Sequence, residues 1–322
     1  MAVPTNTFQR ADVRGNREEL IDKIYQVSPE KTPVTNMCGR VKATAVFHEW
    51  QTDSLAAANE NNAMIDGDDA TTTAIVATQR LGNYLQTFQK TPQVSKMADL
   101  IKKAGRGSEM KYVKANKIME MKRDIEKMVL SSNPAVAPTN SVAGKSAGLG
   151  VQSAVNALHN GAGATAAWTS GAPTTAVTGG TNRAFTEALL KTLAQSVYVA
   201  SGEFSNTLVC SPSHKATFST FTGIAANRFE VKGKQSQGAI IGAADVFMSD
   251  FGAISVMPHY LMVGQNEVYL LNTDFLDLAF MRQFESAELA KTGDSERQMI
   301  LTDVCLAVRA PSAIGKIDDL TP

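Results

Sequence analysis

The sequence predicts an α+β fold, and three observations support this prediction. A strongly periodic helical segment follows a long extended stretch that is rich in β-branched and aromatic residues. The middle of the chain mixes helical and strand patterns, and from Val246 onward the pattern is again that of β-strands. With 322 residues, the chain has enough material for one large domain or two ordinary ones.

Residues 1–42 are predicted to form a polar arm that contains one short helix. Asn16 is a suitable N-cap for a helix through Tyr25, and Pro29 and Pro33 would then end it, because proline lacks the backbone N–H that a helix needs. Behind the first residues there is no apolar run typical of a secretory leader, and no segment approaches the ~18 apolar residues of a membrane span.

Two extended segments, 43–50 and 71–94, are predicted to pair as one long hairpin with an acidic tip at 53–69 and a turn at Gly67. The second arm has about 19 extended residues and would be on the order of 60 Å long. A lone hairpin is at best marginally stable in water, so this one needs a surface to rest on. A neighbouring copy could supply that surface, or the hairpin could fold back on its own domain.

The strongest helix is predicted to begin after Ser108 and to end near Ser131, before Pro134. It would be about 36 Å long. Its apolar residues recur at helical spacing, which predicts one face buried against the rest of the domain. They are Met110, Val113, Ile118, Met121, Ile125 and Met128.

A tract of Gly, Ala, Ser and Thr at 134–182 is predicted to form loops and short, partly mobile elements, because it holds few large apolar side chains. A helix is predicted at 183–198 and a strand at 207–210. Ser211 and Pro212 are a good N-cap and first residue for a helix through Phe221. The remaining predicted strands are 246–248, 254–257, 268–271, 275–284 and 298–308.

Charge is segregated in the first half of the chain, although 31 basic and 31 acidic residues make the whole formally neutral. Residues 43–79 hold six acidic residues and no Lys or Arg, a net charge of −6. Residues 80–127 hold twelve basic and five acidic residues, a net charge of +7. Opposed charges of this kind favour specific association between copies. The neutral total disfavours a dedicated nucleic-acid binder.

The three cysteines, Cys38, Cys210 and Cys305, are odd in number and widely spaced, which favours buried thiols in a reducing compartment such as a cytoplasm. The four histidines are scattered and predict no metal site. The segment beginning at Asp66 departs from a calcium loop, since Ala70 and Ala77 occupy positions that need oxygen ligands. We therefore expect no metal and no cofactor.

One catalytic alternative is a penicillin-recognising serine hydrolase. Its three motifs have matches in the right order, and they involve Ser28, Lys31, Ser131, Asn133 and Lys291. The matches are short enough to arise by chance. Pro33 also disrupts the helix that would have to place Lys31 beside Ser28. This alternative is disfavoured, and no enzymatic activity is expected.

Several segments resemble the major capsid proteins of tailed bacteriophages with the Hong Kong 97 fold, in particular the family typified by elongated-headed podophages. They are RLGNYLQ at 80–86, KRDIEK at 122–127, SPSHK at 211–215, SDFG at 249–252 and LAKTGDSER at 289–297. The last segment is the most specific, and it places Lys291 in a hairpin turn. The resemblance covers about residues 20–315 and excludes the tract at 134–182.

The resemblance implies an N-terminal arm at 1–42, an extended β-hairpin loop at 43–92 and an axial domain of mixed α/β structure at 140–272. It also implies a peripheral domain at 93–139 and 273–322, with its spine helix at about 108–131. In this fold the extended loop lies across a neighbouring copy. The interface residues that we predict on this basis are Asp66, Asp68 and Asp69 on the acidic side, with Lys102, Lys103, Arg106 and Lys111 as partners.

The function implied is a shell subunit that assembles into pentamers and hexamers of an icosahedral or prolate head in the cytoplasm of a bacterial host. Its partners would be further copies of itself, packaged double-stranded DNA held weakly and without specificity, and portal, scaffold or decoration proteins. No membrane partner is expected. The shell of a cellular nanocompartment is an alternative of the same fold. A generic phage surface or decoration protein is a third alternative.

Overall fold

The computed structural model describes residues 31–69, 72–166, 168–221, 245–291 and 293–322. The helix predicted through Tyr25 lies outside these ranges, as does Ser28. The described α-helices are α1 (Pro33–Met37), α2 (Lys96–Leu100), α3 (Glu109–Val129), α4 (Leu149–Gln152), α5 (Glu187–Ser201) and α6 (Pro212–Phe218). Short 3-10 turns occur at η2 (Ala154–Asn156), η3 (Tyr260–Met262), η4 (Thr273–Phe275) and η5 (Pro311–Ala313). Helices and sheets are both present, as the α+β prediction requires.

A five-stranded sheet forms the elongated half of the molecule, with the order β1-β11-β12-β4 and β5 paired to the far part of β12. Its strands are β1 (Gly39–Lys42), β4 (Gln86–Lys90), β5 (Gln93–Ser95), β11 (Leu276–Glu288) and β12 (Ser295–Val308). Only β1 runs parallel to its neighbour β11. The sheet therefore gathers strands from both ends of the sequence.

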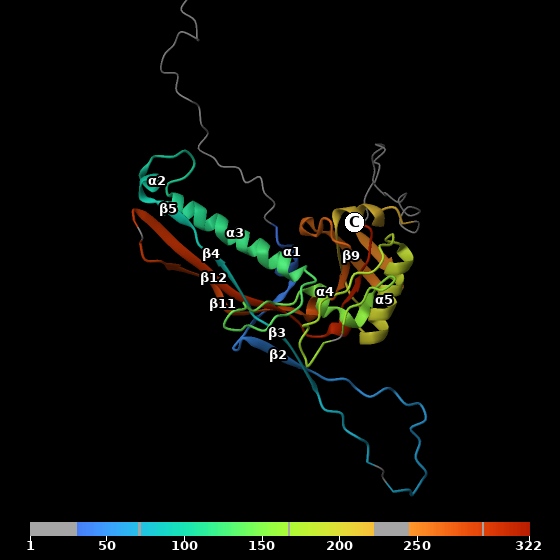
Figure 1. Cartoon of the computed structure of the whole chain (residues 1–322). Coiled ribbons are helices and arrows are strands. Elements are labelled where there is room, and N and C mark those ends of the chain that lie inside the picture. Colours follow the sequence, from blue (N-terminus) through green and yellow to red (C-terminus); the bar gives the residue numbers. More distant parts are fainter. Residues whose placement is uncertain (1–30, 70–71, 167, 222–244, 292) are drawn as a thin grey trace, which may run out of the picture.

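The helix α3 lies along this sheet (Figure 1) and begins where the sequence predicts. The Ser108 hydroxyl accepts a hydrogen bond from the Lys111 N–H at 3.4 Å, which caps the first turn. The apolar side of the helix, including Ile125 and Met128, packs on Leu278 and Val304 of the two long strands. The final strands thus return to the long helix across about 150 residues of sequence.

A second sheet of six strands forms the rounded half of the molecule, in the order β6-β13-β10-β7-β9-β8. Its strands are β6 (Ala157–Leu158), β7 (Thr207–Cys210), β8 (Val246–Ser249), β9 (Gly252–Pro258), β10 (Val268–Leu271) and β13 (Gly315–Ile317). The helix α5 packs on it through Leu190, Leu193 and Val197, and Gly202 ends that helix in the left-handed region with φ 71°. The helix α6 starts at Pro212 behind the Ser211 cap, as predicted.

The predicted long hairpin is wrong in its pairing. The first arm, β2 (Phe47–Thr52), pairs only with β3 (Gln79–Tyr84), and Leu85 separates β3 from β4. The rest of the second arm, β4 and β5, instead pairs with β12. The reason is burial: Phe88 of β4 packs into the core under α3, and Leu85 is buried beside Cys305. The second arm therefore belongs to two different sheets.

The tract at 134–182 contains short elements, as predicted, but residues 146–153 are all buried. Their small side chains permit a close approach to the end of α3. A Cβ added at Gly148 would lie 2.1 Å from the Ser131 carbonyl oxygen, and one at Gly150 would lie 1.8 Å from the Ser132 hydroxyl. A composition that suggests a loose segment instead allows backbone to pack on backbone.

Two features of the described chain bear on the predicted domain division. The strand β13 comes from the segment predicted for the peripheral domain, and it pairs with β10 and β6 of the six-stranded sheet. Between 140 and 272, by contrast, each described strand belongs to that six-stranded sheet. The boundaries themselves stay a prediction.

Candidate inter-subunit surfaces

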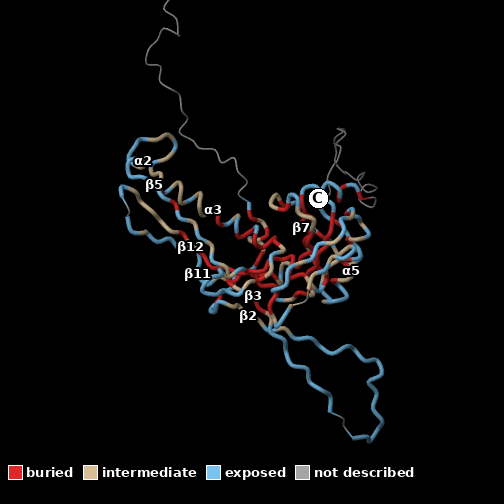
Figure 2. The backbone as a smooth tube through the Cα atoms, viewed as in Figure 1, coloured by how far each residue is buried: buried red, intermediate tan, exposed pale blue. Residues whose placement is uncertain are grey.

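An extended loop at residues 53–78 leaves the body of the molecule beyond the last β2–β3 pair, Thr52 with Gln79. Each residue of this loop that the structure describes is exposed (Figure 2). The chain turns at Gly67, where φ is +81°, and the predicted residues Asp66, Asp68 and Asp69 surround this turn. Within the described ranges none of these three carboxylates makes an ion pair, so the charge of the loop tip is uncompensated.

The loop also carries large apolar side chains that the charge pattern did not reveal. Five of them face solvent, with exposed fractions between 60% and 97%. They are Leu55, Met64, Ile65, Ile75 and Val76. Single exposed apolar residues are common on protein surfaces, but five on one projecting segment make it a candidate contact surface.

The base of the loop is held rigidly by a buried amide. Asn83 of β3 is fully buried, and its Nδ2 donates to the Leu306 carbonyl oxygen at 2.7 Å and to the Ser146 hydroxyl at 3.0 Å. Its Oδ1 accepts from the N–H groups of Ala147 and Tyr84 at 3.0 and 2.9 Å. This single side chain connects the loop base to β12 and to the small-residue tract.

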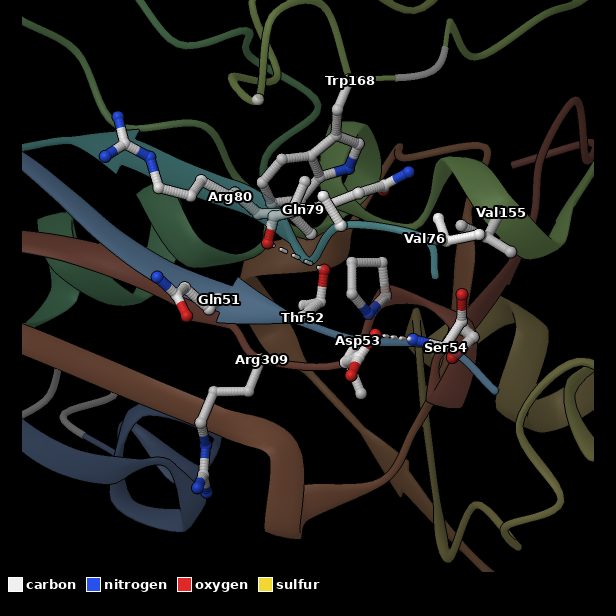
Figure 3. Close-up of a pocket in the computed structure, with 16 residues that line it drawn as sticks. Gln51, Thr52, Asp53, Ser54, Val76, Gln79, Arg80, Val155, Trp168 and Arg309 are labelled. Carbon is white, nitrogen blue, oxygen red and sulfur yellow. Dashed lines mark hydrogen bonds between the residues drawn. The ribbon is translucent and has the colours of Figure 1, made fainter. Parts of the chain in front are cut away.

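A hollow of about 840 Å³ lies beside this base. Figure 3 shows Trp168 pointing into it over Gln79, whereas the Arg309 side chain points away. Arg309 pairs with Asp277 at 2.6 Å, and Arg80, on the rim, pairs with Glu49 at 3.3 Å. Because both of its cations are engaged elsewhere, the hollow offers space beside the loop but no converging charges for a ligand.

The predicted basic residues lie together at the opposite end of the molecule, between α2 and the first turn of α3 (Figure 1). Two of them are already paired within the chain. The Glu109 carboxylate lies 2.7 Å from Arg106 Nε and 3.4 Å from Lys103 Nζ. Lys102 and Lys111 are exposed and make no ion pair within the described residues. The segment is therefore basic, but Lys103 and Arg106 are partly neutralised.

Asp99 holds this basic segment in place. Its Oδ1 accepts the Glu109 N–H at 2.6 Å and the Ser108 hydroxyl at 3.3 Å. The Glu109 N–H lowers the pKa of the Asp99 carboxyl, since a carboxylate at a helix N-terminus is favoured in its charged form. The connection between α2 and α3 is thereby fixed.

Apolar side chains of α2 and the residue after it form an exposed patch that sequence reasoning missed. Met97, Leu100 and Ile101 are 66%, 72% and 59% exposed. We call these three residues the α2 patch. The α2 patch lies between Lys96 and Lys102 in sequence. This end of the molecule therefore presents an apolar surface with a lysine on each side. The signal was present in the sequence, because Met97, Leu100 and Ile101 lie between Lys96 and Lys102.

Among the residues of the serine hydrolase alternative that the structure describes, Ser131 and Lys291 are not brought together. Ser131 and Asn133 follow the C-terminal end of α3, and the buried Ser131 hydroxyl donates to the Met128 carbonyl oxygen at 2.7 Å. Lys291 lines a hollow with Met110, at the N-terminal end of the same helix. The 21 residues of α3 span about 31 Å, so Lys291 and Ser131 occupy opposite ends of the sheet.

The fold does gather one group that resembles a metal site. His159 Nδ1 lies 3.6 Å from Asp318 Oδ2 and 3.4 Å from Asp319 Oδ2. The Lys316 ammonium group lies 2.8 Å from Asp318, and the Asn160 N–H donates to Asp319 at 2.9 Å. These donors already satisfy the carboxylates, and the ammonium group would repel a metal ion. The cluster fastens the C-terminal residues to the second sheet.

Comparison with known proteins gives one family. The model of the SU10 major capsid protein family matches residues 3–321. A major capsid protein of Escherichia phage Phieco32 is 35% identical over 131 residues, which are 41% of this chain and 37% of that relative's length. Within the described ranges, no helix combines the length and the apolar character needed to cross a bilayer.

Solved structures of shell subunits share the fold. A subunit of the cyanophage A-1(L) capsid superimposes with a TM-score of 0.66 at 12% identity, covering 98% of this chain and 99% of that one. The holo-SrpI encapsulin of Synechococcus elongatus PCC 7942 gives a TM-score of 0.55 at 10% identity, covering 95% and 92%.

Proposed function

This chain belongs to the SU10 major capsid protein family and has the capsid fold of tailed phages, and on this premise we propose that it assembles by head-to-tail contacts between copies. The contact joins the acidic tip of the extended loop to the basic segment between α2 and α3 of a neighbour. A heterologous contact of this kind closes into rings, here pentamers and hexamers of an icosahedral or prolate head.

The observation that carries this proposal is the placement of two oppositely charged segments at opposite ends of the folded molecule (Figure 1). Asp66, Asp68 and Asp69 have no ion-pair partner within the described ranges, and neither have Lys102 and Lys111. Lys103 and Arg106 contribute less, because Glu109 already pairs with both. Exposed ion pairs contribute only about 0–1 kcal/mol each, so they select the neighbour and its register. Apolar burial supplies most of the stability.

We also propose the finer assignments of function that the resemblance to these capsid proteins implies. The axial domain at 140–272 surrounds the ring axis, and the peripheral domain at 93–139 and 273–322 contacts adjacent rings. The shell encloses double-stranded DNA, which its neutral subunits contact weakly and without specificity. Assembly takes place in the host cytoplasm and involves portal, scaffold or decoration proteins. No catalytic step is part of this function.

Charge reversal tests the contact. The triple variant Asp66→Lys, Asp68→Lys, Asp69→Lys is compared with the wild type by electron microscopy and sedimentation at low and moderate salt. We expect shells, tubes or rings from the wild type and unassembled protein from the variant. A matched control, Asp53→Lys with Glu60→Lys, changes charge on the same loop away from the tip and should assemble.

A compensating variant makes the test specific. Lys102→Asp and Lys111→Asp, combined with the reversed loop, should restore assembly, because the two sides of the contact are again of opposite sign. If the variant with Asp66, Asp68 and Asp69 replaced by Lys assembles like the wild type at moderate salt, the proposed contact is contradicted.

A further inference from the structure

The α2 patch is presented rigidly to solvent. The Ser95 hydroxyl caps α2 by accepting the Ala98 N–H at 3.2 Å, and the Lys96 N–H donates to the Asp294 carbonyl oxygen at 3.1 Å. On its other side, Asp99 is bound to the start of α3. The helix has no buried residue of its own. The backbone that carries Met97, Leu100 and Ile101 is therefore held in place, while their side chains stay largely unpacked.

The tip of the extended loop has the complementary composition. Met64 and Ile65 are 60% and 78% exposed, and the acidic residues Asp66, Asp68 and Asp69 follow directly. The α2 patch is apolar with Lys96 on one side and Lys102 on the other. Each surface thus combines an apolar centre with charged neighbours. Lys96 and Lys102 oppose the tip carboxylates in sign, and Asp99 between them already accepts the Glu109 N–H, while Asp294 and Glu296 line the hollow beside Leu100. This is the anatomy of a specific contact, with an apolar core and a charged rim.

We propose that the α2 patch is the docking site for Met64 and Ile65 of the loop tip of a second copy. This inference rests on the head-to-tail assembly proposed above and assigns its apolar anchor. It also assigns Lys96 and Lys102 as the rim cations that face the tip carboxylates. Lys103 and Arg106 are not in that role, since Glu109 holds both.

The loop extends away from the body of its own subunit. Its 26 residues at 53–78 can project at most about 43 Å from the body when both halves are extended. In the structure the tip and the α2 patch lie at opposite ends of the molecule (Figure 2). Each copy therefore offers one tip and one patch to different neighbours, as a closing ring requires.

A disulfide between copies tests the contact directly. One protein carries Ile65→Cys and another carries Leu100→Cys, and the two are mixed, assembled and oxidised. Background reaction is low, because Cys38, Cys210 and Cys305 are buried and burial raises the pKa of each thiol to about 12. We expect a disulfide-linked dimer from the mixture and none from either protein alone.

The matched control is Leu55→Cys mixed with Leu100→Cys. Leu55 is 97% exposed on the same loop but lies near its base, so its thiol is equally reactive and wrongly placed. Shells that form normally with no more dimer than in this control overturn the inference and leave the proposed function standing. A mixture that yields neither assemblies nor dimer overturns both.

A second variant measures what the patch contributes. Met97→Ser, Leu100→Ser and Ile101→Ser together should raise the protein concentration needed for assembly on the order of tenfold or more. Thermal unfolding of the unassembled chain should stay unchanged, because the three side chains are exposed there. Ile75→Ser, at a position that is 96% exposed on the other side of the loop, is the control and should assemble normally. An unchanged assembly concentration in the patch variant contradicts the inference.

Discussion

His259 Nε2 lies 2.8 Å from Glu126 Oε1, and neither side chain is exposed to solvent. The Leu261 N–H donates to His259 Nδ1 at 3.1 Å. Nδ1 is therefore the acceptor, and the Nε2–H donates a hydrogen bond to the Glu126 carboxylate. Glu126 also accepts the N–H groups of Val34 and Thr35, each at 2.8 Å. One buried carboxylate thereby joins α1, α3 and η3, and it anchors the chain where the described part of the arm meets the body.

Replacing Glu126 by Gln should destabilise the chain by about 1–3 kcal/mol, because the new amide NH₂ group faces a backbone or imidazole donor and leaves it unpaired. The measurement is the denaturant midpoint of the unassembled protein. Glu120→Gln changes a partly exposed residue of the same helix and should shift stability by no more than about 0.5 kcal/mol. Equal effects of the two substitutions would show that the Glu126 network does not stabilise the fold.

Asn83→Asp should be more damaging at neutral pH, by about 3–5 kcal/mol, because it places a carboxylate against the carbonyl oxygens of Leu306 and Ala147. Burial raises the pKa of such a carboxyl above its value of ~3.9 in the unfolded chain. The loss should therefore shrink as the pH falls from 7 toward 4. Unfolding free energies at pH 7 and pH 5 measure this, with Asn59→Asp on the exposed loop as control. A loss independent of pH would contradict the prediction.

The stability of the wild type should decrease below pH ~6.5 through His214. Burial lowers the pKa of this imidazole, whose nitrogens bond to the Ser211 hydroxyl and the Thr321 carbonyl oxygen at 2.8 and 3.0 Å. A lowered pKa in the folded state means that the unfolded chain binds the proton first. Stability is then lost as the pH falls through the unfolded value of ~6.5 toward the folded one.

His214→Gln should flatten the decrease in unfolding free energy between pH 7 and pH 5. Burial also lowers the pKa of His48, so His48→Gln should remove a further part of it. A slope that is the same in His214→Gln as in the wild type would assign the acid sensitivity to other groups.

The helices α3, α5 and α6 were predictable because their signals are local, whereas the short helices α1, α2 and α4 were not predicted. Ser108 caps α3 and Ser211 caps α6, and in each case the next residues begin the helix as predicted. The strand pairing of residues 79–95 was not predictable in the same way. The apolar character of Leu85 and Phe88 predicts a buried strand but does not identify its partner. That partner, β12, lies more than 200 residues further along the chain.

The charge of the candidate surfaces was predictable from the sequence. Their internal ion pairs and their exposed apolar residues were not. Asp66, Asp68 and Asp69 are exposed at the loop tip, as an acidic run beside a glycine suggests. The pairing of Glu109 with Lys103 and Arg106 depends on how the chain folds between α2 and α3, which a count of charges does not register. The exposure of Leu100 and Ile101 was hidden for the same reason, since apolar residues are expected to be buried.

The division of one extended segment between two sheets has a mechanical consequence. Tension on the loop enters the body at Gln79 and passes through Leu85 into β4 without any flexible linker. The hydrogen bonds between β4 and β12 lie across the direction of that pull, so they resist it together and do not open one after another. In the ring of copies proposed above, one neighbour would hold the loop and another would hold the far end of the sheet. Each subunit would then pass tension from one neighbour to the next, and pressure from inside the shell would act as shear along β12, the longest strand of the described chain.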